Sequence, residues 1–110
     1  MLYVCNAFAL SMLDRARQLA MPRAPRPISI DEARAVANEA ANASRFMSVV
    51  GHADVAAIFT AALGVLVRPN RVSLQLAQHD MLLVGQFIGP RLPEGATALP
   101  PGATIEWWLV

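Results

Sequence analysis

The sequence predicts an α/β fold, a single domain (residues 1–110) in which helices flank a small mixed β-sheet. Three observations predict it. The chain has 110 residues, the length of one domain. Hydrophobic residues make up 55% of it, which is enough for one core. Stretches with the two-residue period of strands alternate with stretches of helical period. The 15% of charged residues and the net charge of +1 exclude an intrinsically disordered chain.

The N-terminal quarter is predicted to contain one strand and one short helix. Residues 2–6 are apolar and begin with β-prone side chains, as in a buried strand. Residues 11–19 have helical spacing. Residues 21–27 contain three prolines, which exclude a regular helix and predict a loop or an extended edge segment.

A second helix has a clear start. Ser29 and Glu32 have the spacing of a capping box, and alanine-rich helical periodicity follows. We expect this helix to end at residues 42–44 and a strand to occupy residues 46–50.

A third helix is predicted after Gly51-His52. Asp54 falls in its first turn, where the helix dipole favours a carboxylate, and Gly64 is suited to end it. Its apolar face has the spacing i, i+3, i+4, i+7 and i+8, at Val55, Ile58, Phe59, Ala62 and Leu63.

The last third of the chain is predicted to be mostly β. Residues 71–76 alternate apolar and polar, as in a half-buried strand, and residues 78–80 form a hairpin-type turn. The nearly continuous apolar run of residues 81–88 predicts a central strand covered on both faces. Residues 89–102 hold four prolines and three glycines and predict a long loop, and residues 104–110 form the last strand.

The composition also limits the possible partners. A balance of nine cationic and eight anionic residues excludes a strong grip on long DNA or RNA but leaves room for a local anion pocket. The single cysteine and two distant histidines predict neither a disulfide nor a metal site, and no phosphate-binding glycine motif indicates a cofactor. The sequence lacks a signal-peptide pattern and an apolar run of about 18 residues, so we expect a cytoplasmic protein without membrane contact.

Four residues have side chains suited to phosphate chemistry. His52 lies between a predicted strand and helix, where it could protonate a leaving oxygen beside an anion-binding helix N-terminus; the alternative is a helix-end residue bonded to backbone. Arg91 could bind phosphate and Glu94 could tune a histidine, or the two form a surface ion pair. Arg71 could face a phosphate or be an ordinary residue at a strand start.

Three other polar positions have simpler readings. Asn6 ends the first strand, where ligands often meet α/β sheets, or it initiates a turn. His79, in a turn, is expected to be solvated. Cys5 is expected to be a small buried apolar residue.

Four segments, taken in order, resemble the viral-type ring nucleases, a family of anti-CRISPR proteins that act on type III systems. The segments are Leu2–Phe8, Gly51–Asp54, Pro69–Val72 and Arg91–Gly95. The resemblance implies a two-fold homodimer that binds cyclic tetra-adenylate and cleaves it without metal into linear di-adenylates in the cytoplasm of a prokaryotic cell. It implies a catalytic set of His52, Arg91 and Glu94, and ligand contacts at Asn6, Ala9, Gly51, Arg71 and Gln86.

Two positions depart from the family pattern. Ala9 stands where relatives usually have Ser, and Val55 where a Thr is common. These departures leave open an alternative, a non-catalytic protein that sequesters cyclic oligoadenylates. A small structural or DNA-binding viral protein is a second alternative, disfavoured because the chain has no basic face.

Overall fold

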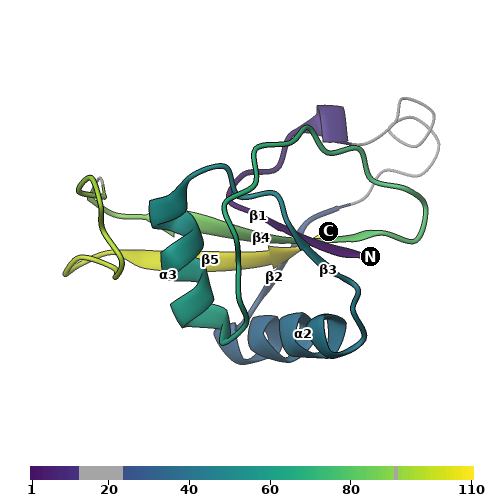
Figure 1. Cartoon of the computed structure of the whole chain (residues 1–110), viewed down its shortest axis with the longest axis horizontal. Helices are drawn as coiled ribbons and strands as arrows, with labels where there is room; N and C mark the ends of the chain where they lie inside the picture. The colour runs from purple at the N-terminus through teal and green to yellow at the C-terminus, as the bar shows by residue number, and fades with distance from the viewer. Residues whose placement is uncertain (13–23, 91) are drawn as a thin grey trace.

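The structure is a computed structural model in which residues 1–12, 24–90 and 92–110 are described. These residues form the predicted α/β fold, with one five-stranded mixed sheet in the order β2-β5-β4-β1-β3 (Figure 1). The strands are β1 (Leu2–Cys5), β2 (Arg26–Ile28), β3 (Phe46–Ser48), β4 (Met81–Ile88) and β5 (Thr104–Leu109). The helices are the short 3-10 helix η1 (Leu10–Met12), α2 (Ile30–Asn42) and α3 (Ala53–Leu63).

The strand directions place three strand ends together. Strand β1 pairs in parallel with β3 on one side and with β4 on the other. Strand β5 runs antiparallel to both β4 and β2. The carboxyl ends of β1, β3 and β4 therefore meet at one edge of the sheet, the usual place for a ligand in an α/β fold.

Local signals fix both long helices. Ser29 caps α2, because its Oγ accepts the backbone N–H of Glu32 at 3.1 Å. Helix α3 ends at Gly64, whose φ of 74° is left-handed and suits glycine. Both predicted helices are confirmed, and their apolar faces pack on the same side of the sheet.

The helix-covered side holds a dense core. Phe59 of α3 and Trp107 of β5 pack with ring centroids 5.0 Å apart. A Cβ placed on Gly85 of β4 would lie 2.5 Å from Phe59 Cζ and 2.7 Å from Trp107 Cζ3. Only glycine leaves room for this aromatic pair against the central strand.

The opposite side is covered by irregular chain, and here one prediction is wrong. Residues 71–76 form no strand and add none to the five of the sheet. Only Leu76 makes a bridge, donating its N–H to the Met12 carbonyl at 2.6 Å. The apolar–polar alternation instead reflects burial, since Leu74 and Leu76 pack under the sheet while Ser73 and Gln75 are exposed.

The remaining predictions mostly agree with the structure. A turn does form around residues 78–80, but it is not part of a hairpin because no strand precedes it. The extended alternative for residues 21–27 is confirmed where it is described, since Arg26–Ile28 forms the edge strand β2. Of the predicted helix at residues 11–19, the part from residue 13 onward lies outside the described residues. Within the described residues, no helix has the length and apolar character needed to cross a membrane.

Candidate functional site

The carboxyl end of β3 is held by Asn70. The side-chain Nδ2 of Asn70 donates to the Ser48 carbonyl at 2.8 Å, and its backbone N–H donates to the Val50 carbonyl at 2.7 Å. The buried Ser48 hydroxyl accepts the backbone N–H of Val50 at 3.1 Å. These bonds fix the path of the chain as it enters Gly51 and His52.

Arg71 lies against Gly51. A Cβ on Gly51 would be 3.1 Å from Arg71 Cγ and 3.6 Å from Arg71 Nε. The missing side chain at Gly51 thus lets the arginine stem lie directly on the backbone beside His52. The structure therefore brings together three residues expected to contact a ligand, Gly51, His52 and Arg71.

His52 is exposed at the N-terminus of α3. It occupies the N-cap position with extended backbone, but its side chain makes no capping hydrogen bond. The alternative in which the imidazole bonds to helix backbone is therefore wrong, because His52 begins the helix without a side-chain bond to it. The helix end itself favours negative charge.

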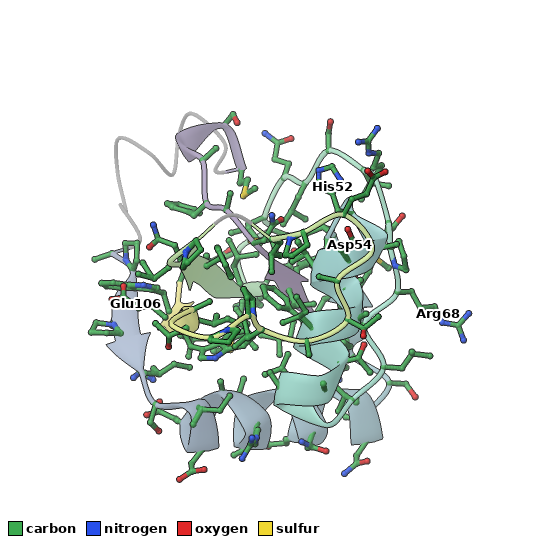
Figure 2. The ribbon with its side chains drawn as sticks, turned by 90° about the vertical axis from the view of Figure 1, so that its left-hand side faces the viewer. His52, Asp54, Arg68 and Glu106 are labelled. Carbon is green, nitrogen blue, oxygen red and sulfur yellow. The ribbon has the colours of Figure 1, made fainter. Side chains whose placement is uncertain are left out.

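A long loop, residues 89–102, comes back to this same helix end. The backbone N–H of Gly95 donates to Asp54 Oδ2 at 3.0 Å, across 41 residues of sequence. Gly95 has a φ of 77°, which suits glycine. This bond brings the backbone of Glu94 close to the start of α3, and Figure 2 shows His52 and Asp54 at that end of the helix.

The sequence predicted a dipole contact for Asp54 but not its role as the loop anchor. No local pattern could reveal a partner so far along the chain. Arg91, in the same loop, lies outside the described residues, so its catalytic role stays a prediction.

Beside His52 is an open hollow of about 500 Å³. His52 and Asp54 line it from the start of α3, Phe87 and Gly89 from the end of β4, and Leu92 from the loop. Val55 also lines it and presents only methyl groups there. An exposed imidazole and a helix N-terminus, which favours anions, thus meet at this hollow. Arg71, which lies against Gly51, is outside its described lining.

A second cavity, of about 390 Å³, brings together Asn6 and Gln86. The cavity also contains Phe8 and Trp108, two aromatic residues that no sequence signal marked as functional. Aromatic residues in or beside strands usually belong to the hydrophobic core, and nothing in the local sequence distinguishes Phe8 and Trp108 from core residues. Ala9 lies outside the lining of both hollows and is exposed.

Other charged residues lie elsewhere. Figure 2 shows Arg68 projecting away from His52, and Glu106 far to the other side. His79 is exposed in its turn and lines a different hollow, together with Met1 and Arg45. Among the described residues, no three His, Cys, Asp or Glu side chains lie close enough to hold a metal ion.

Cys5 is buried at the end of β1, as expected. Burial raises the pKa of its thiol from 9.0 to about 11, and the Sγ donates a hydrogen bond to the Ala7 carbonyl at 3.0 Å. At neutral pH the thiol is therefore protonated and a poor nucleophile.

Comparisons with known proteins agree with this architecture. A family model described as STIV B116-like matches residues 2–100. Among solved structures, the chain is similar to B116 of Sulfolobus turreted icosahedral virus, with a TM-score of 0.78 and 18% sequence identity over 98% of this chain and 96% of that chain. At this identity the likeness shows the fold. No match is found among curated proteins.

Proposed function

The chain belongs to the STIV B116-like family, and from this premise we propose that it is a metal-independent ring nuclease that cleaves cyclic tetra-adenylate into linear di-adenylates. All four segments that resemble viral-type ring nucleases lie within the matched residues 2–100. Such cleavage would end the signal that activates the ancillary nucleases of type III CRISPR immunity. The substrate implies that the reaction takes place in the cytoplasm of a prokaryotic cell.

The observation that carries the proposal is the exposed, uncapped imidazole of His52. Its side chain makes no hydrogen bond to the helix that it begins, so the ring can turn toward a ligand. It lies beside Arg71, which packs on Gly51, at a helix end that favours anions. A proton donor and a cation in neighbouring positions support the cleavage of a phosphate diester.

The chemistry needs no metal, because RNA carries its own nucleophile. The 2′-oxygen attacks the adjacent phosphorus, the new O2′–P bond forms, and the bond from phosphorus to the 5′-oxygen breaks. His52 in its protonated form gives its proton to the departing 5′-oxygen, and the proton of the 2′-hydroxyl passes to solvent. The products carry a 2′,3′-cyclic phosphate, or a 3′-phosphate after hydrolysis, and a 5′-hydroxyl.

Arginine and glutamate have supporting roles in this proposal. Arg71 and Arg91 stabilise charge on the phosphoryl oxygens. Glu94 tunes or orients the histidine, and the bond between Gly95 and Asp54 supports this by bringing the backbone of Glu94 to the start of α3.

Symmetry explains how one ring gives two dinucleotides. In a two-fold homodimer, two copies of His52 would face opposite phosphodiesters of a four-membered ring. Two cuts then release two di-adenylates. The low net charge of the chain suits this, because four phosphates in an enclosed site need a few directed arginines and not a basic surface.

The test is product analysis. The purified protein is mixed with cyclic tetra-adenylate in excess EDTA, and the products are read by liquid chromatography and mass spectrometry. We expect linear di-adenylates from the wild type and from a His79→Ala control, which removes the other histidine of the chain. Cleavage only when metal is supplied, or no cleavage at all, would overturn the proposal.

One observation favours a second function, sequestration of the ring without cleavage. Val55 lines the hollow beside His52 and offers no hydroxyl group to a ligand. If that hydroxyl contributes to cleavage in relatives, this chain would bind the ring and leave it intact. Intact cyclic tetra-adenylate that co-elutes with the protein would show this outcome.

A further inference from the structure

The cavity that contains Asn6 and Gln86 differs in chemistry from the hollow beside His52. Its volume of about 390 Å³ falls in the range of small-molecule sites. None of its described lining residues carries a charge, and the lining combines two aromatic rings, Phe8 and Trp108, with two side-chain amides. Such a lining suits a neutral, planar, hydrogen-bonding group and not a phosphate.

Trp108 adds an independent observation. Its indole Nε1 is buried and has no hydrogen-bond partner among the described residues. Native proteins rarely leave a buried donor without an acceptor, and each such case calls for an explanation. An indole N–H can only donate, so the group that satisfies it must offer a lone pair. The ring nitrogens of a purine do so.

The two hollows lie on opposite sides of the same strand. Gln86 lines the uncharged cavity, and the next residue, Phe87, lines the hollow beside His52. Successive residues of a strand point to opposite faces. A nucleotide whose sugar crosses the carboxyl end of β4 can therefore place its phosphate on one side and its base on the other.

We propose that this cavity, here called the base cavity, binds one adenine base per subunit, and that Trp108 is a specificity-determining residue that donates its indole N–H to a ring nitrogen of that base. The inference rests on the proposed function. It divides the site into a phosphate half at His52 and a base half at Trp108. Phe8 and the indole ring offer apolar surfaces to the base, and the Asn6 and Gln86 amides match the hydrogen-bonding edge of adenine.

The indole nitrogen provides a direct test. In protein labelled with ¹⁵N-tryptophan, two indole N–H signals report on Trp107 and Trp108, and a Trp108→Phe variant assigns them. The probes are cyclic tetra-adenylate, adenosine 5′-monophosphate, and ribose 5-phosphate as a phosphate without a base. Because the nitrogen is covered in the structure, an entering base must displace its neighbours, so its signal should move strongly.

We expect both adenine-containing probes to shift the Trp108 signal and ribose 5-phosphate to leave it in place. Trp107, packed against Phe59 on the other side of the sheet, should move little. A Trp108 signal that stays fixed while cyclic tetra-adenylate is bound would overturn the base cavity.

Binding measurements with variants complete the test. Trp108→Phe keeps an aromatic ring but removes the donor, and we expect it to weaken cyclic tetra-adenylate binding about tenfold, or about 1.4 kcal/mol. Gln86→Ala changes an exposed side chain and so tests the base cavity without risk to folding; it should weaken binding as well. Wild-type affinity in both variants would contradict the proposal.

The outcomes for the two proposals are separable. Binding with a Trp108 shift but without cleavage would support the base cavity and overturn the ring-nuclease activity. Cleavage without any shift of the Trp108 signal would support the ring-nuclease activity and overturn the base cavity. If neither cyclic tetra-adenylate nor adenosine 5′-monophosphate binds to the wild type, both proposals are wrong.

Discussion

The two faces of the sheet are built in different ways. On the helix-covered face, α2 and α3 bury a cluster of thirteen core residues among those described (Figure 1). On the opposite face the described cluster has four, covered by η1 and by the irregular segment of residues 71–77. The candidate site draws on both faces, because the hollow beside His52 lies on the helix-covered face and the base cavity on the other. The helix-covered face should therefore account for most of the stability, whereas side chains of the second face can be changed at a smaller cost.

The largest expected effect comes from truncating an aromatic ring on the helix-covered face. Phe59→Ala removes a buried ring and should lower the free energy of unfolding by about 3–5 kcal/mol. The matched change on the other face, Phe8→Ala, removes a partly buried ring and should cost less than about 2 kcal/mol while weakening nucleotide binding. Urea denaturation measures both, and equal losses of stability would remove the distinction between the faces.

Adding a single methyl group is a smaller change to the helix-covered face. Gly85→Ala places a Cβ 2.5 Å from Phe59 Cζ, so the aromatic pair must shift, at a cost of about 1–3 kcal/mol. Gln86→Ala, the next residue of β4 on the opposite face, is exposed and should unfold like the wild type. If thermal unfolding finds both variants equally stable, the close packing around Gly85 does not prevent the core from accepting a methyl group there.

Alkaline pH should destabilise the second face through Cys5. The Cys5 thiol of the folded chain has a pKa of about 11, whereas a thiol with the ordinary pKa of 9.0 is deprotonated at a lower pH. Stability from this group is complete below pH 9 and falls as the pH rises toward 11, by up to about 2 kcal/mol. A Cys5→Ala variant should lose less stability over this interval, and parallel pH curves for the two proteins would contradict the shift.

The smallest expected effect concerns the loop anchor at the start of α3. Asp54→Ala removes the acceptor for the Gly95 N–H, so Glu94 is less well placed and turnover of cyclic tetra-adenylate should fall by roughly threefold to tenfold. Asp54→Asn keeps an acceptor oxygen and should recover most of the rate. Both variants should bind the ring with similar affinity. If Asp54→Asn turns over the ring as slowly as Asp54→Ala, the hydrogen bond to Gly95 does not determine the turnover rate.

Local signals explain why much of the fold could be predicted. Ser29 and Gly64 mark helix ends through their own backbone and side-chain chemistry, and the apolar run of residues 81–88 correctly indicates the central strand. Residues 71–76 misled because their alternation reflects the burial of Leu74 and Leu76 and not pairing with another strand. Strand pairing joins residues far apart in the sequence, so a window of six residues does not report it.

The candidate site was predictable only in part for the same reason. His52 was singled out by its position between a strand and a helix, whereas Asn6 was noted as the end of a strand and Gln86 only through the resemblance. Their meeting in one cavity is seen only in the structure. The contacts between Gly51 and Arg71 and between Asp54 and Gly95 join segments 20 and 41 residues apart, beyond any local pattern. Phe8 and Trp108 look like ordinary core residues until the cavity between them is seen.

The most direct test of the central claim compares the binding and the turnover of cyclic tetra-adenylate by the wild type and by His52→Ala. If His52 is the proton donor, the variant should bind the ring with near wild-type affinity and cleave it at least about 100-fold more slowly. The wild type should form linear di-adenylates in EDTA throughout. A variant that cleaves at the wild-type rate, or that no longer binds, would contradict the role assigned to His52.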